Sequence, residues 1–271
     1  MGDALAVWLI GLTGFLVLWP ISLWRRDASV VDFWWGPGVG AMVLAAWIGA
    51  GRPMGADVLM IVALAILWSG RLGIHLGIRR LREGAEDARY AEMRAARNPG
   101  WWWKSLLMVF VLQAVLQGII TLPLIAAVSV GTDAALSALI LVASALVLWG
   151  IVLQTVADLE LDRHRARRGH GGLLMTGTRS IVRHPNYLGE IAVWFGLSLL
   201  ALNVGVIWAP ISVLIVTLLL RYVSGVPIIE ERMERTRPEV FPTYRARVPA
   251  LVPRVIDLPR LLGSNLRPDA R

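Results

Sequence analysis

The pattern of apolar and polar residues divides the chain into seven apolar stretches separated by polar connections. Each stretch is close to the roughly 20 residues that a helix needs to cross a bilayer. Seven transmembrane helices are therefore predicted, at residues 5–24, 34–50, 56–78, 104–128, 134–161, 187–203 and 205–223. Pro123 predicts a kink in the fourth helix, and Asn203 with Gly205 predicts a tight turn between the last two.

The predicted fold class is an all-α, polytopic membrane helix bundle. The sequence shows neither an internal repeat nor a low-complexity linker, so one integral membrane domain over residues 1–271 is expected. Residues 255–271 are expected to form a flexible tail.

Composition supports a membrane protein. Hydrophobic residues make up 56% of the chain and charged residues 17%, whereas a soluble domain is about one quarter charged. The chain contains no cysteine, which excludes disulfides and thiolate metal sites. The first apolar stretch is long enough to span and has no small-residue cleavage site after it, so it is expected to be a retained helix.

The distribution of basic residues predicts an orientation. Of 27 Lys and Arg residues, 25 lie in alternate connections or in the tail, while Arg52 lies in an opposite connection and Arg71 within the third helix. The positive-inside rule then places the N-terminus outside and the tail in the cytoplasm, with the mouth of an active site on the cytoplasmic side. The net charge of +8 could indicate a nucleic-acid partner. The arginines lie beside the apolar segments and in the tail rather than along one soluble face, so contact with anionic lipid is expected instead.

Polar residues within the apolar stretches are candidate functional residues, because they are costly to place in a bilayer. Arg71 could pair with Asp32, reach toward the interface or serve a function. Gln113 and Gln117 lie four residues apart on one helix face, so they could line a cavity or bond to a neighbouring helix. By contrast, Gly36 and Gly40 are expected to allow close helix packing rather than to bind a nucleotide.

Carboxylates gather at the end of the fifth predicted helix. Asp158 and Asp162 share a face there, where negative charge opposes the helix dipole, so arginines or a ligand should compensate them. Such a pair could also hold magnesium for a diphosphate, but this needs a second acidic motif, and the run at 83–90 is a poor one. The four histidines lack metal-ligand spacing, and no metal site is expected.

The densest polar run is "RSIVRHPNYLGEI" at 179–191, just before the sixth helix. Arg179 and Arg183 could both grip phosphate, which arginine binds with two donors at once. The run also places Asn186, Tyr187 and Glu190 in the first turn of a helix, whose free N–H groups suit anions. A charged helix entry that anchors the chain at the interface is the simpler alternative.

These stretches carry a family resemblance. The chain resembles the C-terminal domain of the steroid 5α-reductase family, and more narrowly its bacterial branch of uncharacterised integral membrane proteins (DUF1295-like). The matching stretches are "SVVDFWWG" (29–36), "LWSGRLGIHL" (67–76), "EDARYAEMR" (86–94), "TVADLEL" (155–161), "GGLLMTGTRSIVRHPNYLGEIAVWFG" (171–196), "SGVPIIEERM" (224–233) and "YRARVPALVPR" (244–254).

The resemblance implies a seven-helix reductase that transfers hydride from NADPH to a carbon–carbon double bond conjugated to a carbonyl in a lipid. It implies cofactor contacts by Asp158, Asp162, Arg179, Arg183, His184, Asn186, Tyr187, Glu190, Glu231 and Tyr244. We therefore expect the helices of residues 1–128 to hold the substrate and residues 134–254 to bind the cofactor. On the substrate side we expect Arg71, Gln113 and Gln117, the polar residues at membrane depth. The bacterial branch also implies a bacterial inner membrane as the location.

The catalytic residues are where the chain departs from the family pattern. Steroid reductases use a glutamate and a tyrosine from early helices to polarise the carbonyl, and the nearest equivalents here are Asp32 and Tyr90. The substrate could therefore be a sterol-like lipid or an unsaturated acyl chain.

An S-adenosylmethionine-dependent enzyme is the main alternative. Isoprenylcysteine carboxyl methyltransferases share the Arg-His-Pro-x-Tyr-x-Gly run and a later Glu-Glu pair, here residues 183–189 and 230–231. Asn186 and Glu190 favour the reductase. A non-catalytic lipid-binding protein is the second alternative, and in each case the expected partners are membrane lipids and a hydrophobic small molecule.

Overall fold

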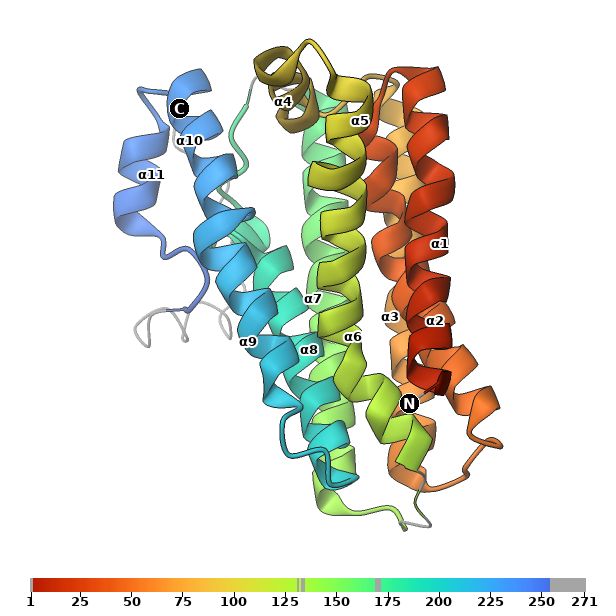
Figure 1. The fold of residues 1–271 in the computed structure, drawn as a ribbon. Helices are drawn as coiled ribbons and strands as arrows, with labels where there is room; N and C mark the ends of the chain where they lie inside the picture. Colours follow the sequence, from red (N-terminus) through yellow and green to blue (C-terminus); the bar gives the residue numbers. More distant parts are fainter. Residues whose placement is uncertain (1, 131, 133–134, 169–171, 254–271) are drawn as a thin grey trace. The chain divides into compact units, whose positions relative to one another are not determined.

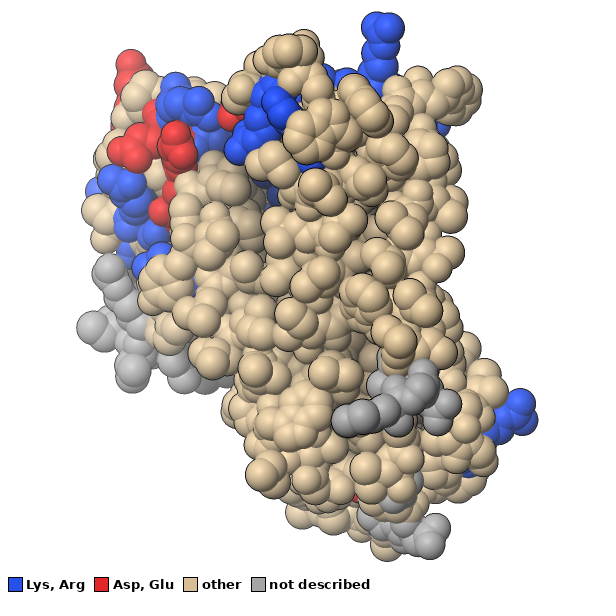
Figure 2. Space-filling model, viewed as in Figure 1, with Lys and Arg blue, Asp and Glu red and all other residues tan. Residues whose placement is uncertain are grey.

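The computed structural model describes residues 2–130, 132, 135–168 and 172–253, with the side chains of 2–4, 83 and 168 excepted. The described residues form helices, turns and loops with no strand (Figure 1). Seven of their helices are long and apolar enough to cross a membrane: Leu5–Arg25, Ala28–Gly49, Ala56–Arg82, Trp101–Val130, Ala138–Arg167, Pro185–Asn203 and Pro210–Thr236. The predicted all-α membrane fold with seven spans is confirmed, and most of the face drawn in Figure 2 is uncharged.

The chain groups into two compact units, of which unit 1 comprises residues 1–148 and 193–215 and unit 2 comprises residues 149–192 and 216–271. Continuous helices join the two units. Unit 1 contains α1 (Gly2–Arg25), η1 (Ala28–Trp34), α2 (Trp35–Gly49), α3 (Ala56–Glu83), α4 (Ala88–Arg97), α5 (Trp101–Ser105), η2 (Leu106–Val111) and α6 (Leu112–Val130). The long helices α7 (Ala138–Arg168), α8 (Pro185–Asn203) and α9 (Pro210–Leu218) contribute to both units.

Helix α2 packs against α1, α3 and α6 within unit 1. A Cβ atom on Gly36 would lie 2.7 Å from the Ser69 carbonyl oxygen of α3, and one on Gly40 would lie 2.9 Å from the Ser69 side chain. Only glycine permits this approach, so the prediction that these two glycines allow close helix packing is confirmed.

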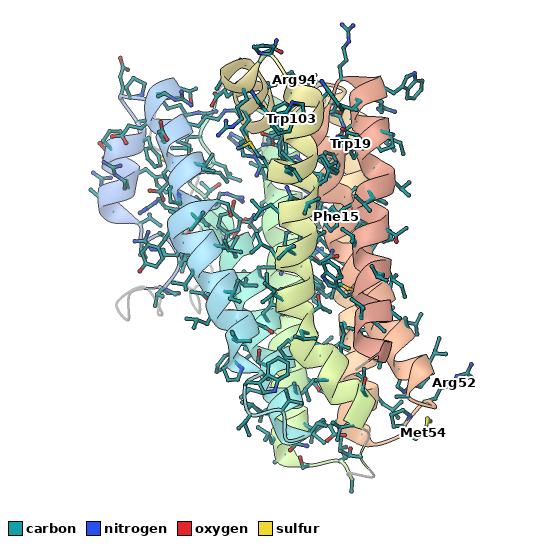
Figure 3. The ribbon with its side chains drawn as sticks, viewed as in Figure 1. Phe15, Trp19, Arg52, Met54, Arg94 and Trp103 are labelled. Carbon is teal, nitrogen blue, oxygen red and sulfur yellow. The ribbon has the colours of Figure 1, made fainter. Side chains whose placement is uncertain are left out.

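Buried aromatic residues form part of the core of unit 1. Phe15, Phe110, Trp101 and Tyr90 belong to one apolar cluster built from α1, α4, α5 and η2. The side chain of Phe15 is labelled among these helices in Figure 3. This packing fixes α4, a polar helix outside the predicted spans, against the end of the membrane helices.

Unit 2 adds η3 (Gly177–Ser180), η4 (Leu219–Val223), α10 (Val226–Thr236) and α11 (Phe241–Arg247) to its parts of α7 to α9. Its α7 and α8 segments approach closely, because a Cβ on Gly189 would lie 2.7 Å from the Gly150 carbonyl oxygen. Pro227 lies in the first turn of α10, where its missing N–H costs nothing.

Some helix boundaries differ from the prediction. The fifth span begins at Ala138 rather than 134, and the seventh begins at Pro210 rather than 205. Gly205 adopts φ +98°, which confirms a turn after α8, but this turn is longer than predicted. The tail predicted to be flexible, 255–271, lies outside the described residues.

Candidate active site

The short helix η1 carries Asp32 and is held at its start by polar contacts. Asp27 caps η1 by accepting a 3.0 Å hydrogen bond from the Ser29 N–H, and its other oxygen pairs with Arg80 of α3. Glu86 accepts a 2.8 Å hydrogen bond from the Ala28 N–H. These bonds tie η1 to α3 and to the segment before α4, and thereby fix the position of Asp32.

The predicted catalytic residues lie together in a tyrosine–carboxylate network of Asp32, Arg89, Tyr90 and Gln113. The Tyr90 hydroxyl donates a 2.6 Å hydrogen bond to Oδ1 of Asp32, and Arg89 donates one of 2.9 Å to Oδ2. Gln113 Nε2 donates a 3.1 Å hydrogen bond to the Tyr90 hydroxyl. Both carboxylate oxygens are thus bonded within unit 1, and the Asp32 side chain remains 28% exposed, so a ligand can reach it.

The network keeps Tyr90 protonated. Burial, followed by the negative charge of Asp32, raises the pKa of the Tyr90 phenol well above 10.0. Burial alone would lower the pKa of Arg89, but the charge of Asp32 outweighs it and the pKa is raised. Asp87, beside Arg89, has a lowered pKa: burial would raise it, but hydrogen bonds from Arg89 prevail. A neutral phenol beside a paired carboxylate can donate a hydrogen bond or a proton to a ligand.

The two glutamines of the polar stripe bond to neighbouring segments. Trp35 Nε1 donates a 2.6 Å hydrogen bond to Gln113 Oε1, and Gln117 Nε2 donates 3.0 Å hydrogen bonds to the carbonyl oxygens of Trp34 and Trp35. The side chain of Gln117 is fully buried. The stripe therefore bonds to η1 and α2, as one of the two alternatives predicted. Arg71 lies half-buried in α3.

In unit 2, the predicted phosphate-binding arginine Arg183 belongs to a Glu230 cluster of Arg183, His184 and Glu230. Arg183 Nε donates a 2.8 Å hydrogen bond to Glu230 Oε1, and His184 Nε2 lies 2.9 Å from the same oxygen. Arg183 also donates hydrogen bonds to the carbonyl oxygens of Arg245 and Val248. The Arg183 side chain is only 9% exposed, so its donors are used within the protein.

The other arginine of the run is also engaged. Arg179 is buried and donates a 2.9 Å hydrogen bond to the Ala157 carbonyl oxygen, while its own carbonyl oxygen accepts one of 2.6 Å from the Tyr244 hydroxyl. Burial lowers the pKa of Arg179 and raises the pKa of Tyr244 to about 12. Arg179 and Tyr244 thus join α7, η3 and α11.

The carboxylates of unit 2 have different surroundings. Glu160 accepts hydrogen bonds from the N–H and the hydroxyl of Thr178, at 3.0 and 2.6 Å. Gln154, buried in α7, donates a 2.9 Å hydrogen bond to Glu190 of α8. Asp158, Asp162 and Asn186 are half-buried in the same two helices, and Glu231 is exposed.

The structure therefore brings together Asp32, Tyr90 and Gln113 in unit 1, and Arg183 and His184 in unit 2. It also shows contacts that the sequence analysis did not assign: Arg89 on Asp32, Gln154 on Glu190, and Glu230 on Arg183. Glu230, rather than the adjacent Glu231, contacts Arg183. Helix α10 begins at Val226, and this start determines which of the two glutamates faces the arginine. The Tyr187 ring stacks on His184 with ring centroids 5.3 Å apart.

Over the described residues these features define a class: an integral membrane protein with seven membrane-length apolar helices, a partly buried tyrosine–carboxylate network in one unit and a glutamate-centred polar cluster in the other. The family comparison is more specific. The chain belongs to the family described as protein of unknown function DUF1295, whose family model matches residues 18–248.

One relative is an uncharacterised protein of the fission yeast Schizosaccharomyces pombe, which is 28% identical over 205 residues. The alignment covers 66% of this chain, and the chain spans only 58% of that relative's length. No solved structure matches the chain.

Proposed function

We propose that the chain is a membrane-embedded reductase that uses NADPH to reduce a carbon–carbon double bond conjugated to a carbonyl in a lipid. The substrate would be sterol-like or would carry an unsaturated acyl chain. The observation that carries the proposal is the 2.6 Å hydrogen bond from Tyr90 to Asp32. It supports the role assigned to these two residues by the resemblance to steroid 5α-reductases.

In the proposed mechanism, Tyr90 polarises the carbonyl of the substrate. Its raised pKa keeps the phenol protonated, and Gln113 holds the oxygen from the other side. The Tyr90 hydroxyl would then donate its hydrogen bond to the substrate carbonyl oxygen instead of to Asp32. The charge of Asp32 would still be balanced by Arg89, which bonds to Oδ2. Bound NADPH would supply the hydride, which goes to the β-carbon while the negative charge develops on the oxygen next to Tyr90.

The residues of unit 2 fit part of a dinucleotide. Asn186 and Glu231 offer polar groups for an amide or ribose hydroxyls, and the buried Nε2 of His164 has no hydrogen-bond partner among the described residues. The phosphates of the dinucleotide have no such partner in Arg183, because Glu230 and backbone carbonyl oxygens already accept the hydrogen bonds of this arginine. No phosphate contact is therefore assigned to Arg179 or Arg183 in this conformation.

The occupied donors of Arg183 also support a second candidate function, methyl transfer from S-adenosylmethionine. This cofactor carries no phosphate and has positive charge, so it does not need free arginines and suits a site with several carboxylates. The run from Arg183 to Gly189 and the pair Glu230–Glu231 match both enzyme classes, as noted above. The tyrosine–carboxylate network is the feature that favours reduction.

We further propose that the basic end of unit 1 faces the cytoplasm, in a bacterial inner membrane. In Figure 3, Arg94 and Trp103 lie at one end of unit 1 and Arg52 with Met54 at the other. The end that holds Arg94 also holds the other cations of α4, and Arg25 and Arg26 at the C-terminal end of α1. This asymmetry supports the orientation given by the positive-inside rule.

Cofactor choice can be tested by thermal unfolding of the purified protein in detergent. NADPH at about 100 times its Kd should stabilise the protein by about 2.7 kcal/mol, while S-adenosylmethionine should have no effect. The reverse result would support the methyltransferase, and no response to either would support a non-catalytic lipid-binding protein.

A matched pair of variants tests the assignment of Glu231. We expect Glu231→Gln to reduce the stabilisation by NADPH and Glu239→Gln, another exposed carboxylate of unit 2, to leave it unchanged. Equal stabilisation of the two variants would remove Glu231 from the cofactor site.

A further inference from the structure

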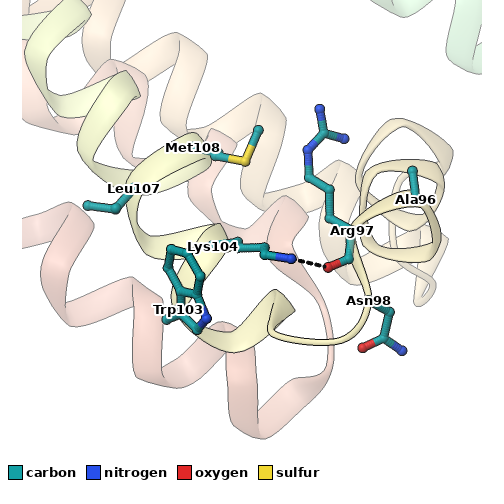
Figure 4. Close-up of a pocket in the computed structure, with 7 residues that line it drawn as sticks. All are labelled: Ala96, Arg97, Asn98, Trp103, Lys104, Leu107 and Met108. Atoms are coloured by element: carbon teal, nitrogen blue, oxygen red, sulfur yellow. Dashed lines mark hydrogen bonds between the residues drawn. The ribbon is translucent and has the colours of Figure 1, made fainter.

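Unit 1 contains a pocket where α4 ends and α5 begins, with a volume of about 390 Å³. It is lined by Arg97, Asn98, Trp103, Lys104, Leu107 and Met108 (Figure 4). We call it the α4–α5 pocket. None of these residues belongs to the tyrosine–carboxylate network, so the pocket is separate from the proposed catalytic residues.

Two cations line the polar side of the pocket. Lys104 Nζ donates hydrogen bonds to the carbonyl oxygens of Arg97 and Pro99, at 3.1 and 2.9 Å. An ammonium group has three donors, so one remains for a ligand. The Arg97 guanidinium has no hydrogen bond or ion pair to any described residue, and both cations line the pocket (Figure 4). Together they present several free N–H donors to an anion.

The other side of the pocket is apolar and continues into a membrane span. Trp103 and Leu107 are 46% and 55% exposed, and they belong to the first turns of the span Trp101–Val130. Leu112 is exposed further along the same span. The pocket thus combines cations at the end of a span with an apolar surface that faces lipid, and an interfacial tryptophan lies beside them.

We propose that the α4–α5 pocket binds the phosphate group of an anionic membrane phospholipid. Arg97 and the free donor of Lys104 bind the phosphate oxygens, which arginine does with two parallel hydrogen bonds. An acyl chain lies along Leu107 and Leu112. Positive charge excludes a cationic headgroup from close contact, and the volume is within the range of small-molecule sites.

Native mass spectrometry of the detergent-purified protein can test this proposal with phosphatidylglycerol and phosphatidylcholine as probes. We expect phosphatidylglycerol to stay bound at energies that release phosphatidylcholine. Arg97→Gln should weaken phosphatidylglycerol binding about tenfold, which is the loss of roughly one charge-assisted hydrogen bond. The Arg97 guanidinium makes no hydrogen bond or ion pair with the described residues, so this variant is expected to fold normally.

Arg25→Gln is the matched control, because Arg25 is an exposed cation outside the pocket. Equal binding by the Arg97 and Arg25 variants, or equal retention of the two lipids, would overturn the proposal. Displacement of phosphatidylglycerol by millimolar inorganic phosphate would overturn the lipid assignment and give the site to a soluble phosphate compound. Persistence of the lipid in excess phosphate is the expected result.

Discussion

The hydroxyl of Tyr90 lies 2.6 Å from Oδ1 of Asp32, although 58 residues separate them in the sequence. One residue is in η1 and the other in α4, and the contact depends on the bonds that Asp27 and Glu86 make around the start of η1. A buried phenol held against a carboxylate at the end of a membrane span is a costly arrangement to keep without a function.

Tyr90→Phe should lower the rate of NADPH oxidation in membranes by 100-fold or more, in the range of about 10² to 10⁴ that a positioned acid contributes. The free energy of unfolding should fall by only about 1 kcal/mol, because Arg89 still pairs with Asp32. Tyr222→Phe is the control, since Tyr222 is exposed. Full activity of the Tyr90 variant would show that the phenol is not the acid.

Glu230→Gln should lower the free energy of unfolding by about 2 kcal/mol, because it removes the charge that balances Arg183 and bonds to His184. Glu231→Gln should be close to neutral, because this neighbour is exposed. Denaturation midpoints in one detergent give the comparison. Equal losses would mean that the Glu230 cluster does not hold unit 2 together.

Stability should depend on pH through His184. Burial lowers the pKa of His184 below its usual 6.5, despite the opposing contact with Glu230. Above pH 6.5 the imidazole is neutral in both states, but below it the unfolded chain takes up the proton first. Stability should therefore fall as the pH drops below 6.5, by up to about 1.4 kcal/mol per pH unit, until the folded state is protonated too.

The control for this effect is His184→Gln, which keeps a hydrogen-bond donor for Glu230 but does not titrate. The difference in unfolding free energy between wild type and this variant should shrink from pH 7 to pH 5. A constant difference would show that His184 has the same pKa in both states.

Gly189→Ala should lower the free energy of unfolding by about 1–3 kcal/mol, since its Cβ would lie 2.7 Å from a backbone oxygen of α7, which cannot move aside easily. Gly70→Ala should be neutral or slightly stabilising, because a Cβ there meets nothing within 4 Å and alanine favours the helix. Thermal unfolding of both variants provides the measurement. A stable Gly189 variant would mean that α7 and α8 pack more loosely.

Hydropathy was sufficient to predict the spans, because each must be long and apolar whatever its neighbours are. It could not predict α4, which is a polar helix held by Tyr90 in the apolar cluster. The family resemblance gave Asp32 and Tyr90 as the nearest equivalents of the catalytic pair, and in the structure these two residues form a hydrogen bond.

Adjacent residues were harder to tell apart from sequence. The choice between Glu230 and Glu231 depends on the phase of α10, which is set by a break at Ser224 and Gly225. The bonds that occupy Arg183 come from carbonyl oxygens of residues 245 and 248, beyond the reach of any local pattern. Arg183, which the sequence suggests as a phosphate ligand, is therefore used in this conformation to hold parts of unit 2 together.

Isotope transfer tests the central claim most directly. Membranes that contain the protein would be incubated with NADPH deuterated at the transferring position, using lipids extracted from cells that lack the gene, and the lipids would be analysed by mass spectrometry. The proposed reductase predicts one lipid that gains a deuterium from the cofactor and a proton from water, and a rate of formation lower by about 100-fold or more with Tyr90→Phe. Absence of deuterated lipid, with transfer of a labelled methyl group from S-adenosylmethionine instead, would contradict the account.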